Sequence, residues 1–240
     1  MDAEADIMRI FGKGFNFAED GPGNRLVYHL SGCNMKCIWC SNPDGMDKNA
    51  GKEYTVEELF RECKSCIPMF FGGGGVTFTG GEATLQAEEL TCLLKLLKAE
   101  GISTCIETNG TSSRLTDISE LVDYLIMDFK HFDDEKLKKY TGIGTEKVKE
   151  NFEALSKIRK QLHIRIPLIN EINTQNPEGF AEYFKNHNTQ NTVFEFLAYH
   201  EYGKEKWKTE YKVQNGFITS ETLEEFKRIF EANGLNTITT

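Results

Sequence analysis

Three cysteines within eight residues are the first feature of this sequence that could do chemistry. Cys33, Cys37 and Cys40 have the spacing C-x3-C-x2-C. A structural zinc ion or a fully ligated iron–sulfur cubane takes four protein ligands. Three thiolates can hold three irons of a [4Fe–4S] cluster and leave the fourth iron open, and an open position is what a catalytic metal site keeps. The triplet therefore indicates a metal centre with one position reserved for another molecule.

A zinc site, or thiols that merely pack, is the alternative interpretation of these cysteines. His29, four residues before the triplet, and the pair Cys63 and Cys66 are the candidates for a fourth ligand. Between residues 41 and 75 the chain has only those two cysteines, too few for an eight-cysteine, two-cluster ferredoxin-like insert. We expect no auxiliary cluster, and we expect Cys63 and Cys66 to be incidental thiols on one helix face.

The remaining cysteines, Cys92 and Cys105, lie in apolar helical and strand patterns and are expected in the core.

The elements that must position the triplet alternate between strand and helix. Strands are expected at residues 25–31, 75–81, 102–110, 122–130, 163–170 and 191–199, and helices at 55–63, 86–101, 146–160, 176–186 and 220–234. Thr55 and Glu58 form a capping-box signal, and Asn176 with Pro177 marks another helix start. This alternation predicts an α/β fold with a parallel sheet. Six strands are too few for a closed eight-stranded barrel, so we expect a partial, six-stranded β/α barrel in a single domain over residues 1–240.

Polar clusters follow four of the expected strands. They are TGGE (79–82), ETNG (107–110), MDFK (127–130) and YHEYGK (199–204). In parallel α/β folds the chemistry lies at the carboxyl ends of the strands, which is also where the cysteine triplet falls. The glycine run before TGGE is not a phosphate loop, because it precedes a strand and lacks the G-K-[ST] ending. These glycines are expected to let backbone approach a ligand.

Composition narrows the class of protein. Apolar residues make up 39% and charged residues 27% of the 240 residues, which is ordinary for a globular protein. The net charge of −9 argues against a non-specific nucleic-acid binder. No apolar run approaches 18 residues and the first residues are acidic, so neither a membrane span nor a signal peptide is expected. Seven clustered cysteines fit a reducing, cytoplasmic environment.

The cysteine spacing after the first strand resembles the signature of the radical S-adenosylmethionine (radical SAM) enzymes. TGGE resembles the GGE motif of that family. Five further blocks, DGPGNR (20–25), GGGVTFTGGEATLQAE (73–88), TCIETNG (104–110), IMDFKH (126–131) and YHEYGKEKW (199–207), resemble, in order, the activating enzymes of glycyl radical enzymes. The resemblance covers residues 8–240, and pyruvate formate-lyase is the partner of the most similar activases.

The resemblance implies a set of site residues. One [4Fe–4S] cluster is expected on Cys33, Cys37 and Cys40, and with Lys130 these are the catalytic residues. S-adenosylmethionine is expected against Trp39, Cys40, Ser41, Gly81, Glu82, Glu107, Asp128, Phe129, Lys130, Arg165 and His200. A monovalent cation is expected at Glu107, Thr108, Met127 and Asp128. In the family, aspartate stands where this chain has Glu107 and histidine where it has Ser41. By analogy, the loop at Asp20 faces the glycyl segment of the partner.

The resemblance also implies the reaction. A flavodoxin or ferredoxin gives one electron to the cluster, S-adenosylmethionine splits into methionine and a 5′-deoxyadenosyl radical, and that radical removes a hydrogen atom from a glycine of a pyruvate formate-lyase-like enzyme. We expect an anaerobic, cytoplasmic monomer. The alternatives are a radical SAM enzyme acting on a small molecule, such as a deazaguanine-forming enzyme, an anaerobic ribonucleotide reductase activase, and a zinc-binding module without enzyme activity.

Overall fold

The computed structural model describes residues 6–159 and 161–238. They form two compact units, and each is described here by itself. The first comprises residues 6–34, 42–108 and 114–125, and the second comprises residues 35–41, 109–113 and 126–238 apart from 160. That the whole chain acts as one domain stays a prediction.

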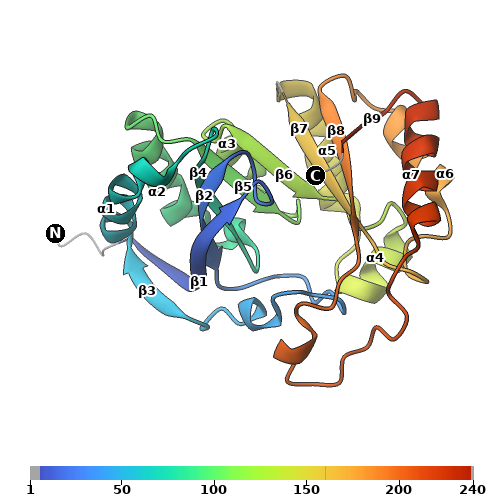
Figure 1. Cartoon of the computed structure of the whole chain (residues 1–240), viewed down its shortest axis with the longest axis horizontal. Coiled ribbons are helices and arrows are strands. Elements are labelled where there is room, and N and C mark those ends of the chain that lie inside the picture. The colour runs from blue at the N-terminus through green and yellow to red at the C-terminus, as the bar shows by residue number, and fades with distance from the viewer. Residues whose placement is uncertain (1–5, 160, 239–240) are drawn as a thin grey trace. The chain divides into compact units, whose positions relative to one another are not determined.

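The first unit is built on five strands in the order β3-β1-β2-β4-β5. The strands are β1 (Ile7–Phe17), β2 (Asn24–Leu30), β3 (Lys52–Thr55), β4 (Gly75–Gly80) and β5 (Thr104–Thr108). β2, β4 and β5 are parallel, whereas β1 runs antiparallel to both of its neighbours. The helices are α1 (Val56–Ser65), α2 (Ala87–Ala99) and α3 (Leu115–Ser119), with 3-10 turns η1 (Pro43–Met46), η2 (Ile67–Met69) and η3 (Ala83–Gln86). α1 and α2 lie side by side (Figure 1).

The second unit is built on parallel strands in the order β6-β7-β8-β9. They are β6 (Tyr124–Asp128), of which the last three residues belong to this unit, β7 (Leu162–Leu168), β8 (Thr192–Ala198) and β9 (Asn236–Ile238). The helices are α4 (Asp134–Thr141), α5 (Glu146–Ile158), α6 (Pro177–Lys185) and α7 (Ser220–Ala232), with the 3-10 turn η4 (Lys204–Lys206). α6 and α7 lie side by side (Figure 1).

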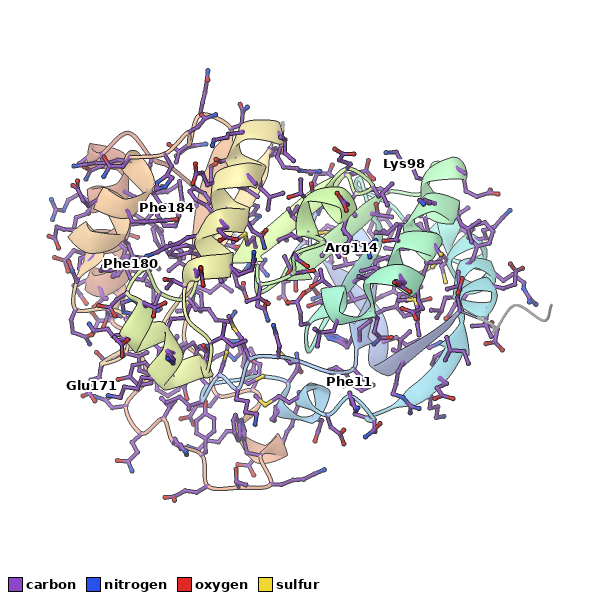
Figure 2. The ribbon with its side chains drawn as sticks, turned by 180° about the vertical axis from the view of Figure 1, so that it is seen from behind. Phe11, Lys98, Arg114, Glu171, Phe180 and Phe184 are labelled. Carbon is purple, nitrogen blue, oxygen red and sulfur yellow. The ribbon has the colours of Figure 1, made fainter. Side chains whose placement is uncertain are left out.

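An aromatic cluster forms the core of the second unit. Phe129 packs against Phe184 with ring centroids 4.7 Å apart, and Phe184 packs against Phe194 at the same distance. Phe180 and Phe184 project from α6 into this cluster (Figure 2). Because stacked and edge-to-face rings add to the energy of burial, the cluster fixes α6 against the strands that carry the expected site residues.

The α/β class and all six expected strands are confirmed. The capping box is present, because the Thr55 side chain accepts from the backbone of Glu58 and the Glu58 carboxylate accepts from the backbone of Thr55. Asn176 caps α6 as expected. Strands β1, β3 and β9 were not expected from the sequence.

One cysteine was placed wrongly. Cys105 is buried as expected, but Cys92 is exposed on α2. The buried positions of α2 are Leu90, Leu93, Leu94 and Leu97, so the helix faces the core with a stripe that leaves Cys92 outside. Among the described residues, no helix has both the length and the apolar character needed to cross a membrane.

Candidate active site

The expected cluster cysteines belong to both units. Cys33 comes directly after β2 in the first unit, whereas Cys37 and Cys40 lie in the short segment 35–41 of the second. The backbone N–H of Cys40 donates to the carbonyl of Cys37 at 3.1 Å, which closes a tight turn between these two thiols. Cys37 is buried, and Cys33 and Cys40 are partly exposed.

The segment 35–41 is fastened to the end of α4. Lys36 N–H donates to the carbonyl of Thr141 at 2.7 Å, and Ile38 N–H donates to the carbonyl of Tyr140 at 3.2 Å. Trp39 is buried, and its ring lies 6.4 Å from the ring of Tyr140. These contacts hold the backbone on both sides of Cys37 and fix where Trp39 lies.

A fourth thiolate for the cluster does not come from Cys63. A thiol must lose its proton before it can bind a metal. Cys63 is fully buried on α1 with its Sγ 3.7 Å from the Tyr28 hydroxyl, and burial raises its pKa to about 12. Cys63 therefore stays protonated near neutral pH. His29, the other candidate, packs against Phe11 at 5.6 Å. That Cys33, Cys37 and Cys40 hold a cluster with one open iron stays a prediction at this point.

The TGGE turn lies against the backbone that leads to Cys33. Gly81 N–H donates to the carbonyl of Leu30 at 2.9 Å, and Glu82 N–H donates to the carbonyl of Gly32 at 2.7 Å. A Cβ atom on Gly81 would come within 2.2 Å of the Gly32 oxygen and 2.3 Å of the Gly45 oxygen. Only glycine fits there, because the chain's own backbone occupies the space of a Cβ atom. That the glycines let backbone approach a ligand stays a prediction.

Glu82 ties the ends of β4 and β5 together. Its Oε1 accepts from the Thr84 N–H at 3.1 Å and from the Thr108 hydroxyl at 2.8 Å, and the side chain is buried. Next to it, Glu107 accepts from the Thr79 hydroxyl at 2.8 Å. The Thr108 hydroxyl thus joins two expected site residues, Glu82 and Thr108, whereas Glu107 is joined to Thr79 on β4.

A row of charged residues crosses the strands of the second unit. Asp128 on β6 pairs with Arg165 on β7, which pairs with Glu195 on β8, so the three side chains lie on one face of the sheet. Arg165 Nε donates to Glu195 Oε2 at 2.7 Å, and Lys130 Nζ lies 2.5 Å from Asp128 Oδ2. The row therefore alternates in charge and brings together three expected cofactor residues.

His163 approaches the same carboxylate. Its Nε2 lies 2.9 Å from Glu195 Oε2, at an ion-pair distance but in an orientation that does not suit a hydrogen bond. Glu195 and His163 were not singled out from the sequence. The available signal was a glutamate in the middle of an apolar strand, TVFEFLA, opposite alternating charges in LHIRIPL.

Phe129 and Met127 point away from that charged face. Phe129 is fully buried in the aromatic cluster, stacked on Tyr183 at 5.2 Å, and its N–H donates to the carbonyl of Arg165 at 2.8 Å. Met127 is also fully buried, and its side chain fills the space beside Gly110. Only the backbone of these two residues is therefore suited to contact a cofactor or a cation.

His200 follows β8 and is half-buried. Its ring stacks on Tyr202 with centroids 4.1 Å apart, and burial lowers the pKa of the imidazole. His200 is thus neutral at pH 7, which suits packing against a nucleoside. Ser41, the residue that replaces the family histidine, receives a hydrogen bond at its carbonyl from Lys206 Nζ at 3.2 Å.

Asp20 lies in the loop between β1 and β2, at the amino end of β2, whereas Cys33 follows its carboxyl end. The Asp20 carbonyl accepts from the Thr77 hydroxyl at 2.7 Å, and its carboxylate accepts from Asn16 Nδ2 at 2.5 Å. Arg25, which is fully buried, donates to the carbonyl of Pro22 at 3.2 Å. The loop is therefore a fixed structure and not a loose turn.

Comparison with known proteins identifies the class. The family model of the radical SAM superfamily matches residues 27–184, and the chain belongs to that superfamily. Members of this superfamily use S-adenosylmethionine and a [4Fe–4S] cluster held by three cysteines. Its relatives within the superfamily make the chain one of the activating enzymes of glycyl radical enzymes.

The chain is 36% identical, over 204 aligned positions, to a protein named pyruvate formate-lyase-activating enzyme from Clostridium pasteurianum, with 82% of this chain and 85% of the relative covered. It is 29% identical, over 286 positions, to the trans-4-hydroxy-L-proline dehydratase activating enzyme of Clostridioides difficile, with 91% and 94% covered.

A crystal structure of a domain of the pyruvate-formate lyase-activating enzyme from Bacteroides vulgatus has a similar fold, with a TM-score of 0.59 and 24% identity over 70% of this chain and 99% of that domain. The expected partial barrel of the radical SAM type is thereby confirmed.

Proposed function

We propose that this protein activates a pyruvate formate-lyase-like enzyme by forming a glycyl radical on it. The similarity to the Clostridium pasteurianum activase carries this choice of partner. The alignment with the hydroxyproline dehydratase activase runs over 286 positions, more than the 240 residues of this chain, so it contains gaps in this chain. The pyruvate formate-lyase activase aligns over 204 positions and needs no such extension.

When bound, the cluster and S-adenosylmethionine supply one-electron reductive cleavage and the radical that takes the glycine hydrogen. The chain's own residues bind these two groups and exclude water from them. Cys33, Cys37 and Cys40 hold the cluster, and the glycine backbone at Gly81 binds the amino-acid end of the cofactor. Lys130 lies next to Asp128 with only 10% of its side chain exposed, so it offers a cation for a carboxylate with little competition from water.

Several assignments extend this proposal. Trp39, Ser41 and His200 bind the adenosine part of the cofactor, and Glu82 and Glu107 also contribute to its binding. Arg165 on β7 and the backbone of Phe129, directly after β6, also bind S-adenosylmethionine. A monovalent cation binds among Glu107, Thr108, Met127 and Asp128, which offer two carboxylates, a hydroxyl and a backbone carbonyl, the oxygen ligands that hard cations take.

The Asp20 loop is proposed to receive the glycyl segment of the partner. Support comes from its fixed backbone, since a rigid loop loses little entropy on binding. A reduced flavodoxin or ferredoxin supplies the electron. The protein acts as a cytoplasmic monomer under anaerobic conditions, in line with its clustered cysteines.

The test is an anaerobic activation assay. Reconstituted protein, S-adenosylmethionine and a reductant are mixed with a pyruvate formate-lyase, and the glycyl radical is followed by EPR spectroscopy as a doublet. Each single substitution C33S, C37S and C40S is expected to abolish the doublet and lower the bound iron, whereas C66S should leave both unchanged. The proposal would be overturned if a C33S, C37S or C40S variant gave the full EPR doublet. It would also be overturned if wild-type protein that holds about four irons gave no doublet.

A further inference from the structure

The connection between β8 and α7, residues 199–219, returns to the third cysteine of the triplet (orange to red in Figure 1). Trp207 Nε1 donates to the carbonyl of Cys40 at 3.1 Å. One residue earlier, Lys206 Nζ donates to the carbonyl of Ser41 at 3.2 Å. Two consecutive side chains thus bind two consecutive carbonyls, which belong to the peptide links directly before and after the Cα of Ser41.

The approach of the two segments is close enough to require glycine. A Cβ atom on Gly203 would lie 2.4 Å from the Ser41 oxygen and 2.5 Å from its Cα. Gly203 is buried, and the 3-10 turn η4 begins directly after it. Backbone contact at Gly203 and side-chain contact at Lys206 and Trp207 therefore hold the same short stretch of the cysteine segment.

Trp207 is itself held in place. Its ring meets the ring of Tyr211 edge to face at 5.7 Å. The Tyr211 hydroxyl lies 2.8 Å from the hydroxyl of Tyr199, which is buried at the end of β8. The indole N–H is thus aimed by a chain of contacts that begins on the sheet, so its hydrogen bond to Cys40 costs little additional ordering.

We propose that Trp207 is a positioning residue for the cluster: its indole N–H fixes the backbone of Cys40 and thereby the place of the Cys40 sulfur. This rests on the proposed function, in which Cys40 is a cluster ligand. The end of α4 holds the segment 35–41 from one side, and Trp207 holds it from another. Groups that orient a metal ligand influence both how tightly the metal is held and its electronic properties.

The test compares Trp207→Phe with wild-type protein. The substitution keeps an aromatic ring against Tyr211 and removes the N–H donor. After anaerobic reconstitution, iron release to a chelator is expected to be about tenfold faster, the scale seen for lost supporting contacts at metal sites. The EPR spectrum of the reduced cluster should change in its g values, whereas the circular dichroism and the unfolding midpoint of the iron-free protein should not.

Two further comparisons sharpen the result. Tyr183→Phe is the control for removing a polar atom from an aromatic ring, because the Tyr183 hydroxyl is buried without a hydrogen-bond partner among the described residues. Lys206→Met removes the donor to Ser41 and should accelerate iron release by a smaller factor. Lys212→Met, an exposed lysine on the same connection, should release iron as wild-type protein does.

The outcomes separate this inference from the proposed function. Wild-type protein that binds no [4Fe–4S] cluster contradicts the proposed function. Wild-type protein that binds the cluster, with Trp207→Phe releasing iron at the same rate and with the same spectrum, overturns only the positioning role. If Trp207→Phe releases iron faster but with an unaltered spectrum and a lower unfolding midpoint, Trp207 merely stabilises the fold and the inference is wrong.

Discussion

Arg165 and Glu195 lie directly opposite each other on β7 and β8, and the guanidinium Nε donates to the carboxylate at 2.7 Å. Both side chains are nearly excluded from solvent, with 11% of Arg165 and 2% of Glu195 exposed. A buried ion pair costs much to desolvate and is costly to break from one side. The role of the ion pair is therefore to hold the Arg165 side chain in one orientation on the charged face of the sheet.

Replacing Glu195 by Gln should weaken cofactor binding. The amide keeps the shape and one hydrogen bond but removes the charge that orients Arg165. We expect the Kd for S-adenosylmethionine, measured anaerobically by calorimetry, to rise about tenfold, which corresponds to about 1.4 kcal/mol. The free energy of unfolding should fall by about 1–3 kcal/mol, because a buried charged group loses its partner.

The matched control is Glu182→Gln on α6. Glu182 forms an ion pair with Lys185 at the surface, where solvent and salt screen the interaction. Neither the Kd nor the unfolding midpoint should change. If Glu195→Gln binds the cofactor as wild-type protein does, Arg165 does not depend on Glu195 for its orientation.

Removing the Cys63 thiol should leave the cluster intact. Burial raises the Cys63 pKa to about 12, so near neutral pH the residue is a small apolar thiol and not a ligand. After reconstitution, Cys63→Ala is expected to bind as much iron as wild-type protein. Alkylation with iodoacetamide at pH 8 followed by mass spectrometry should label the exposed Cys92 in the folded protein and spare Cys63. If Cys63→Ala loses iron, Cys63 is a fourth ligand and the site is a closed, four-thiolate one.

Much of this fold is local and was therefore visible in the sequence. Six of the parallel strands were recognised because each is a short apolar run bounded by turn residues, and the capping residues Thr55 and Asn176 marked the starts of their helices. β1 was missed because its pattern is broken by two glycines and a register shift between Ile10 and Gly12, and much of the strand is exposed. Such a strand is specified by its pairing partners and not by its own periodicity.

The candidate site residues also fall into two groups, those that the sequence indicates and those that only the folded chain brings together. Candidate site residues that belong to contiguous motifs, such as Gly81 or Lys130, could be proposed from the sequence. Glu195, His163 and Trp207 were not, because their partners lie 30 or more residues away and only the folded chain brings them together. Cys92 shows the opposite error, since the position of a residue around the helix axis decides between core and solvent, and the apolar pattern alone did not fix that angle.

Gly81 should tolerate no side chain. In Gly81→Ala the new Cβ would collide with two backbone oxygens, which cannot rotate away as a side chain could. We expect the turn to move, the unfolding free energy to fall by about 1–3 kcal/mol, and the affinity for S-adenosylmethionine to be lost or strongly reduced. Gly14→Ala on β1 is the control, because an added methyl group there would meet nothing within 4 Å. Equal cofactor affinity in both variants would exclude Gly81 from the binding site.

His131, the last residue of the IMDFKH block, should make the protein sensitive to acid. The ring is buried, its Nδ1 accepts from the Asp133 N–H at 2.9 Å, and burial lowers the pKa to about 4, with Lys136 and Lys149 adding to the effect and Asp133 opposing it. The unfolded chain binds the proton near pH 6.5 and the folded chain only near pH 4. The stability linked to His131 is thus complete above pH 6.5 and is lost as the pH falls toward 4.

At pH 5 this difference amounts to about 2 kcal/mol of unfolding free energy relative to pH 7. His131→Asn is the informative variant, because its Oδ1 can accept the same hydrogen bond and does not titrate. Urea unfolding between pH 7 and 5 should show a shallower loss of stability for the variant than for wild-type protein. Carboxylates titrate equally in both, so the difference between the two curves isolates the imidazole. Parallel curves would mean that His131 becomes protonated in the folded state without penalty, and that its burial does not exclude the charge.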